Sequence, residues 1–202
     1  MQDLPLLGAS NHVFIDGQWR DGASRETLPL LNPSDGSTLA RIARGNGADI
    51  DSAVAAAQTA LDGEWGSLTA AERGRALMRL SQRVLAASDD LARLEAMDVG
   101  KPLKQAKADA LALARYLEFY AGAADKVMGE TIPYARGTTA LTLREPHGVT
   151  GHIVPWNYPM QIIGRSVGAA LAMGNACVLK PAEEACLTAL AFAQLASESG
   201  LP

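Results

Sequence analysis

The alternation of hydrophobic and polar positions changes twice along the chain, and the first stretch is typical of β-structure. Val13–Ile15 and Gln18–Arg20 flank Asp16-Gly17, a dipeptide that favours a two-residue hairpin turn. A second turn cluster occupies residues 32–36, and the helical pattern begins after it. We therefore expect a small β unit that precedes a helical region.

Four helices are predicted in that region. The first has apolar residues at the spacing of one helix face. They are Ile50, Val54, Ala57 and Leu61. The second opens with a capping box, in which Thr69 and Glu72 satisfy each other's backbone N–H groups. Its apolar stripe consists of Leu77, Leu80 and Val84.

The third and fourth helices follow without a long loop. Ser88 is predicted to cap the third, which ends at Gly100 before Pro102. The fourth runs from about Leu103 to Lys126 and is rich in alanine. Small side chains let helices pack closely, so we expect all four helices to pack in the core.

Residues 129–145 break the helical pattern and predict a β-hairpin. A turn at Arg136-Gly137 separates Ile132-Pro133-Tyr134 from a longer arm at residues 141–144. Isolated hairpins are marginally stable in water, so this one needs a second surface. We expect a sheet edge that another subunit completes. The alternative is that the hairpin folds back on its own domain.

From Gly148 onward the pattern is β-α-β-α. Strands are predicted at Val149–Val154 and at residues 176–180, and helices at residues 159–173 and 183–199, the last closed by Gly200. Pro159 suits a first helical turn, where its missing N–H is not needed. Alternating strands and helices predict an α/β fold with a Rossmann-like parallel sheet, here incomplete because such a sheet needs further strands.

Composition excludes several classes of function. Of 202 residues, 48% are hydrophobic and 20% are charged, as in ordinary globular proteins. A net charge of −4 and 5% aromatic residues argue against a nucleic-acid partner. Residues 1–10 lack the features of a signal peptide, and no apolar run is long enough to span a membrane. Two cysteines suit the cytoplasm, and three scattered histidines predict no metal site.

Both predicted strand ends carry residues suited to chemistry, and ligands of open α/β sheets bind at such ends. After the first strand comes Pro155-Trp156-Asn157-Tyr158-Pro159. The amide of Asn157, preorganised in a dry cleft, can stabilise an oxyanion that forms on a carbonyl carbon. The alternative is that Asn157 only caps the following helix.

After the second strand comes Lys180-Pro181-Ala182-Glu183. A carboxylate at Glu183 can accept both hydroxyls of an adenosine ribose and would repel a 2′-phosphate, which favours NAD over NADP. The alternative is a surface ion pair between Lys180 and Glu183. The usual G-x-G-x-x-G fingerprint is absent after the first strand.

These segments closely resemble the aldehyde dehydrogenase superfamily. The resemblance is carried by residues 145–159, by Gly174-Asn175 and by residues 180–183 with the closing Ser199-Gly200-Leu201-Pro202. It implies the N-terminal part of that fold: residues 1–126 as helices and β unit of the NAD-binding domain, 127–145 as an oligomerisation hairpin and 146–202 as the first βαβα of the sheet. A dimer or tetramer formed through the hairpin is expected.

The resemblance also implies roles for individual residues. Asn157 is expected to stabilise the tetrahedral thiohemiacetal. The residues expected to bind the cofactor are Ile153, Val154, Pro155, Trp156, Lys180, Ala182 and Glu183. The implied reaction is NAD-dependent oxidation of an aldehyde to a carboxylic acid.

The cysteine nucleophile and the glutamate base of that mechanism are expected to follow Pro202. Cys177 is predicted to lie in the core, and Cys186 in a first helical turn that lowers its pKa somewhat. We therefore expect no aldehyde oxidation from the 202-residue polypeptide alone. The alternative is a truncated, non-catalytic relative that acts as an assembly or NAD-binding fragment.

The helix after Asn157 lines the aldehyde tunnel in the family, which would place Tyr158, Ile162 and Arg165 near the substrate. A guanidinium in an apolar tunnel is costly unless it meets an anion. Arg165 therefore favours an aldehyde that bears a carboxylate, such as a semialdehyde. The alternative is an arginine turned to solvent or paired with a glutamate outside this chain.

Overall fold

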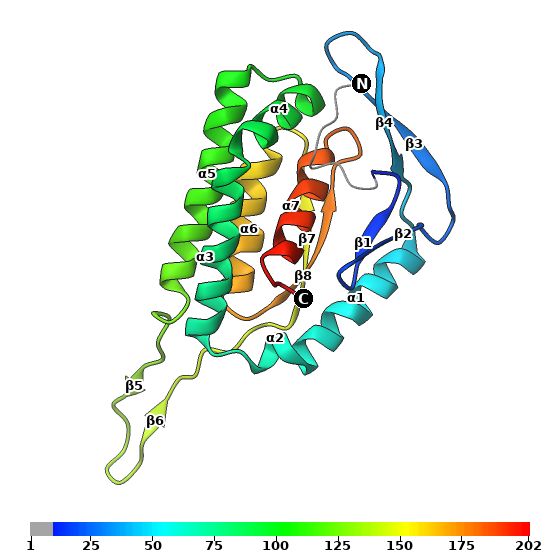
Figure 1. The fold of residues 1–202 in the computed structure, drawn as a ribbon. Helices are drawn as coiled ribbons and strands as arrows, with labels where there is room; N and C mark the ends of the chain where they lie inside the picture. The colour runs from blue at the N-terminus through cyan, green and yellow to red at the C-terminus, as the bar shows by residue number, and fades with distance from the viewer. Residues whose placement is uncertain (1–9) are drawn as a thin grey trace.

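Most of the helices pack together beside a short parallel sheet, whereas the helix of residues 47–62 lies at the other edge of that sheet with the N-terminal β unit (Figure 1). The computed structural model describes residues 10–202; residues 1–9, part of the segment without signal-peptide features, lie outside this range. The elements in order are β1 (Val13–Ile15), β2 (Gln18–Arg20), β3 (Thr27–Leu31), β4 (Thr38–Ala43), α1 (Gly47–Asp62), α2 (Glu64–Ser67), α3 (Ala70–Ala86), α4 (Ser88–Val99), α5 (Leu103–Ala123), β5 (Thr131–Ile132), β6 (Ala140–Leu141), β7 (Val149–Val154), α6 (Pro159–Ala172), β8 (Ala176–Pro181) and α7 (Leu187–Glu198).

The N-terminal β unit contains two antiparallel pairs. β1 and β2 form the predicted hairpin, with Asp16 and Gly17 at φ values of 56° and 68°, as a type I′ turn requires. β3 and β4 form a second pair around the turn cluster at residues 32–36. The sequence patterns identified that turn but not these two strands, because Pro29 and the bulge after Leu30 interrupt a clean alternation.

The four predicted helices are present, with two differences. The capping box of α3 is confirmed: Glu72 N donates to Thr69 Oγ1, and Thr69 N donates to Glu72 Oε2. The prediction that Ser88 caps α4 is wrong, because Ser88 lies inside the helix and its hydroxyl instead accepts a hydrogen bond from Lys107. On α1, Ala57 is buried and Leu61 packs against the core as expected, whereas Ile50 and Val54 are exposed, so the predicted face enters the core only in the second half of the helix.

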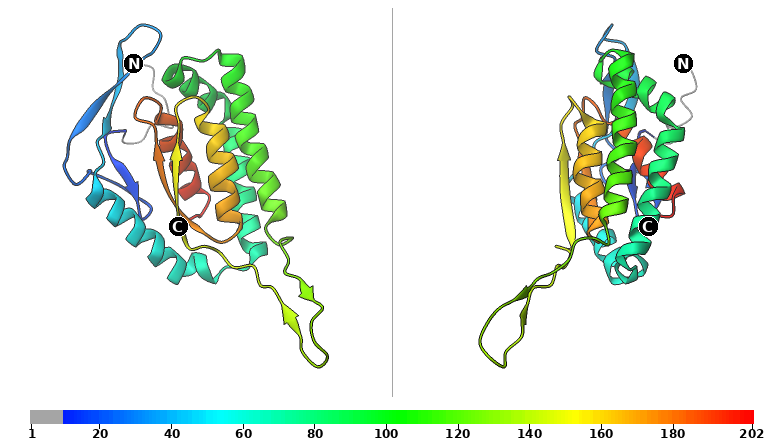
Figure 2. Two further views of the ribbon diagram at one scale, coloured as in Figure 1. Left: turned by 180° about the vertical axis from the view of Figure 1, so that it is seen from behind. Right: turned by 90° about the vertical axis from the view of Figure 1, so that its left-hand side faces the viewer.

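Small residues set the spacing of the long helices, as the alanine-rich pattern predicted. α5 lies between α3 and α6 (Figure 2). A Cβ at Gly74 of α3 would lie 2.6 Å from the carbonyl oxygen of Ala121, and one at Gly164 of α6 would lie 3.0 Å from the Tyr116 ring. Leu77, Leu80, Leu113 and Leu117 are fully buried in the core that these helices share.

The α/β expectation is confirmed by the parallel pairing of β7 with β8. Pro159 occupies the first turn of α6, as predicted. The last helix begins later than predicted, at Leu187 rather than Glu183. Residues 182–185 instead form a tight turn, in which Ala185 N donates to Ala182 O, so the chain leaves β8 before it turns into α7.

The hairpin at β5 and β6 projects away from the helices (Figures 1 and 2). It does not fold back on its own domain, and Met128, Tyr134 and Leu143 are each more than 70% exposed. The paired strands are only two residues long, so the longer arm predicted at residues 141–144 is not a continuous strand. The protruding arm therefore presents apolar side chains and unpaired backbone groups to its surroundings.

Candidate active site

The two chemically distinctive segments meet because β7 and β8 run in parallel. Val154 pairs with Pro181 and Ile153 with Lys180 in the register of the two strands. Both carboxyl ends therefore lie at one edge of the sheet, where ligands of open α/β sheets bind. The structure thus brings together the residues that follow each strand, as the sequence analysis expected.

Asn157 lies in the short connection between β7 and α6. The first residue before the helix is Tyr158, and within the described part of the chain no side chain caps this end. Asn157 is therefore not the helix cap, and the alternative raised from its sequence position is wrong. Within residues 10–202 no hydrogen bond involves its side-chain amide, which is exposed and available to a ligand.

Lys180 and Glu183 are both exposed at the end of β8. Lys180 Nζ donates to the carbonyl oxygen of Pro181 at 2.9 Å. Among the ion pairs within residues 10–202, none joins Lys180 to Glu183, so the alternative of a surface ion pair does not describe this site. The Glu183 carboxylate remains available to accept hydrogen bonds from hydroxyl groups.

The remaining predicted cofactor residues differ in accessibility. The side chains of Ile153 and Trp156 are 83% and 59% exposed, so each presents apolar surface near the end of β7. Val154 is 1% exposed and belongs to the core, so only its backbone can face a ligand. Pro155 is exposed and Ala182 half-buried in the turn after β8.

The three residues predicted near the substrate lie on or just before the first turns of α6. Tyr158 and Arg165 are exposed, while Ile162 is half-buried. Arg165 Nε donates to the Gln161 carbonyl oxygen at 3.3 Å, one turn earlier in the helix. Its guanidinium thus lies along the helix surface.

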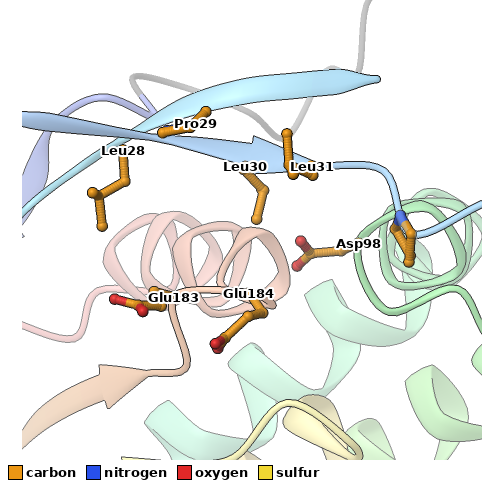
Figure 3. Close-up of a pocket in the computed structure, with 8 residues that line it drawn as sticks. Leu28, Pro29, Leu30, Leu31, Asp98, Glu183 and Glu184 are labelled. Atoms are coloured by element: carbon orange, nitrogen blue, oxygen red, sulfur yellow. The ribbon is translucent and has the colours of Figure 1, made fainter. Parts of the chain in front are cut away.

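A depression of about 390 Å³ lies between β3 and the turn before α7 (Figure 3). Glu183 and Glu184 line one side and Leu30 and Leu31 the other, and the Asp98 carboxylate points into it. Asp98 Oδ2 accepts a hydrogen bond from Leu187 N at 2.8 Å, so it caps α7 from α4. Its Oδ1 is buried and has no hydrogen-bond partner within residues 10–202, and burial raises the pKa of Asp98 to about 7.

A cluster of buried charges that the sequence analysis did not predict lies under Asn157. Lys101 Nζ contacts Glu95 Oε1 at 2.5 Å and Asp109 Oδ2 at 2.7 Å, and it donates to the Asn157 carbonyl oxygen at 3.2 Å. Glu95 and Asp109 are buried, although both are charged residues on helix faces. Their position on the apolar faces of α4 and α5, next to Leu94 and Ala110, was the signal in the sequence.

The pKa values in this cluster reflect burial and pairing. Burial raises the pKa of Glu95 to about 7, although the hydrogen bond from Lys101 opposes that shift. Burial also disfavours the charged form of Lys101. Hydrogen bonds to Asp109 and Glu95 outweigh this cost, so the pKa of Lys101 is raised. The ammonium group is therefore charged at neutral pH.

Neither cysteine has the properties of a nucleophile. Burial raises the pKa of Cys177 to about 11. Burial raises the pKa of Cys186 to about 12, and the negative charge of the nearby Asp98 contributes to this shift. The sequence analysis expected a lowered pKa for Cys186, and this is wrong because the residue precedes α7 within the core rather than facing solvent.

Residues 10–202 contain no group of three or more His, Cys, Asp or Glu side chains with the arrangement of a metal site. No helix within the same range has the length and hydrophobicity needed to cross a membrane.

Most of this chain matches a known protein family. A family model described as the aldehyde dehydrogenase family matches residues 19–202. Hydroxyisobutyraldehyde dehydrogenase from Mycolicibacterium austroafricanum is 44% identical over 191 residues, which are 94% of this chain and 38% of that protein.

Solved structures show the same similarity in three dimensions. A candidate aldehyde dehydrogenase from Burkholderia cenocepacia is 67% identical with a TM-score of 0.92, over 94% of this chain and 40% of that one. PnpE in complex with nicotinamide adenine dinucleotide is 39% identical with a TM-score of 0.92, over 96% of this chain and 40% of its own. This chain thus spans only 38% to 40% of the length of these three proteins.

Proposed function

This chain belongs to the aldehyde dehydrogenase family, and from that premise we propose that it contributes a cofactor wall and an oxyanion donor to the NAD-dependent oxidation of an aldehyde to a carboxylic acid. The observation that carries the proposal is the register of β7 and β8, which brings the Asn157 loop and Glu183 to one edge of the sheet. The side-chain amide of Asn157 is exposed and does not cap α6, so it is free to polarise a bound carbonyl group.

The residues present fit a nicotinamide dinucleotide. Ile153 and Trp156 offer bare apolar surface, and Glu183 offers an unpaired carboxylate for the ribose hydroxyls. The bound dinucleotide would accept a hydride from the substrate. Because a carboxylate repels a 2′-phosphate, we propose NAD as the preferred form, and replacing Glu183 with Gln should raise the ratio of kcat/KM with NADP to that with NAD.

Asn157 would stabilise the oxyanion of a thiohemiacetal formed on a cysteine thiolate. With pKa values of about 11 and 12, Cys177 and Cys186 do not supply that thiolate at neutral pH. We therefore propose that a cysteine other than these two supplies the thiolate that attacks the aldehyde. The two free cysteines also agree with a reducing compartment, and we propose the cytoplasm.

The experiment uses the protein expressed from its whole reading frame and measures NADH formation with a panel of aldehydes. Asn157→Ala should lower kcat on the order of a hundredfold to a thousandfold, because one oxyanion donor is lost, while NAD affinity is retained. Asn11→Ala, at an exposed asparagine of the N-terminal β unit, is the matched control. No NADH with any aldehyde, or an unchanged kcat in Asn157→Ala, contradicts the proposal.

For the substrate, we propose an aldehyde that bears a carboxylate, because Arg165 is an exposed cation on the helix that follows Asn157. Arg165→Ala should lower kcat/KM for semialdehydes by about tenfold relative to short aliphatic aldehydes, as expected for a lost charged hydrogen bond. An unchanged ratio between the two substrate classes would count against a role for Arg165.

A further inference from the structure

The ammonium group of Lys101 has no free hydrogen-bonding capacity. An ammonium carries three N–H donors. Those of Lys101 have three acceptors, namely Glu95 Oε1 on α4, Asp109 Oδ2 on α5 and the backbone carbonyl oxygen of Asn157. The Lys101 side chain is only 9% exposed. Carboxylates on two helices therefore fix the position of the ammonium group. Its third hydrogen bond holds the backbone of the loop between β7 and α6 that contains Asn157.

The ring of Tyr158 adds a second contact between this cation and the loop. Lys101 Nζ lies 4.7 Å from the ring centroid, within the range of a cation–π interaction. Lys101 thus contacts two consecutive residues of the segment between β7 and α6. One contact holds the peptide group that follows the Asn157 side chain, and the other holds the adjacent ring.

The Asp109 carboxylate, which binds Lys101, also holds the first turn of α6. Asp109 Oδ1 accepts a hydrogen bond from Gln161 Nε2 at 2.6 Å, while its Oδ2 accepts from Lys101. Since no side chain of the described residues caps the start of α6, the contact from Asp109 on α5 anchors that end. The Asn157 loop is consequently fixed to the helical layer on both sides of Tyr158.

We propose that Lys101 is a positioning residue for the reaction, which acts by fixing the backbone of Asn157 so that its side-chain amide points at the developing oxyanion. Glu95 and Asp109 are the anchors that hold the ammonium in place. An oxyanion donor depends on its geometry, and a misplacement of about 1 Å can cost a hundredfold in rate. The inference rests on the proposed function, because it assigns Lys101 a role through Asn157.

Lys107 provides a matched control. Unlike Lys101, which lies between α4 and α5, Lys107 lies on α5; it reaches α4, where its Nζ contacts Ser88 Oγ at 2.9 Å and Asp89 Oδ1 at 2.5 Å. It thus forms the same kind of link between the two helices without a contact to the Asn157 loop. A variant at Lys107 reports the cost of losing such a link alone.

The test compares Lys101→Met and Lys107→Met in the protein expressed from its whole reading frame. Lys101→Met should lower kcat by about tenfold to a hundredfold with little change in NAD affinity, and Lys107→Met should leave kcat unchanged. In an Asn157→Ala background, Lys101→Met should have no further effect on kcat, because the residue it positions is gone. Independent, multiplying effects of the two substitutions would overturn the proposal.

Hydrogen exchange measures the same claim without any activity. Backbone amides of residues 156–158 and 160–162 should exchange faster in Lys101→Met than in Lys107→Met, and equal protection in the two variants would overturn the positioning role. If Lys101→Met does not fold, the pair Lys101→Gln with Glu95→Gln removes a cation and an anion together and takes its place. A wild-type protein that forms no NADH refutes the proposed function, whereas the exchange measurement still decides the position of the loop.

Discussion

Buried charge is the main feature at the scale of single residues. Glu95, Asp98 and Asp109 are almost fully buried, and each has a different compensation. Among residues 10–202, Asp109 is bonded through both oxygens, Glu95 through one, and Asp98 only to the Leu187 amide. A buried carboxylate with an unpartnered oxygen is costly when charged, which makes the protein sensitive to pH at Glu95 and Asp98.

Asp98→Asn tests this sensitivity. The pKa of Asp98 is raised from 3.8 to about 7 in the folded state, so the folded state binds its proton more tightly than the unfolded chain does. The stability that the folded protein gains from binding this proton is complete below about pH 4 and is lost as the pH rises through about 7. The free energy of unfolding should fall less steeply between pH 4 and 7 in Asp98→Asn, by up to about 1 kcal/mol per pH unit.

Urea denaturation across this pH range provides the measurement. Asp51→Asn, which removes an exposed carboxylate of α1, controls for the loss of one negative charge. Parallel curves for wild type and Asp98→Asn would contradict the assignment.

At the scale of elements, close approach of the helices depends on glycine at particular positions. Gly74 and Gly122 lie on the neighbouring helices α3 and α5, but their surroundings differ. A Cβ at Gly74 would meet the backbone of Ala121, whereas one at Gly122 would meet nothing within 4 Å. Sequence patterns predicted that these helices pack closely, but they did not distinguish the two glycines, because the crossing point depends on the packed geometry.

Gly74→Ala should therefore lower the free energy of unfolding by about 1–3 kcal/mol, because α3 must move away from α5. Gly122→Ala should instead raise it by up to about 0.5–1 kcal/mol, since alanine favours the helix and has room. Chemical denaturation of both variants checks the prediction. Stabilisation by both substitutions would show that the helices separate without cost.

At the scale of the whole molecule, the hairpin of β5 and β6 extends away from the other described elements (Figure 2). Its apolar side chains are exposed and its two strands pair over only two residues each. These features are typical of a sheet edge that pairs with a strand of another chain. The structure shows that it projects, and its role in a homo-oligomer is our proposal. The base of the hairpin is closed by Thr142 N, which donates to Glu130 O, and by Glu130 N, which donates to Thr142 Oγ1.

Joining Glu130 to Thr142 through a two-residue Asn-Gly turn should remove the arm and leave the helices folded. The mass measured by sedimentation should fall to that of a smaller assembly, while far-ultraviolet circular dichroism stays nearly the same. A variant that replaces only Arg136-Gly137 with Asn-Gly keeps the arm and controls for the altered turn. An unchanged mass after deletion would place the interface elsewhere.

The sequence by itself determined the features that depend on neighbouring residues: the Asp16-Gly17 turn, the Thr69–Glu72 capping box, Pro159 at the start of α6 and the order of strands and helices from Gly148. Local backbone preferences and hydrophobic periodicity suffice for these. Only the tertiary structure decided which distant groups meet. Lys101 reaches Asn157 across 56 positions, and Asp98 reaches Leu187 across 89. Such contacts depend on the packing of α4, α5, α6 and α7 together, and no local pattern in the chain specifies it.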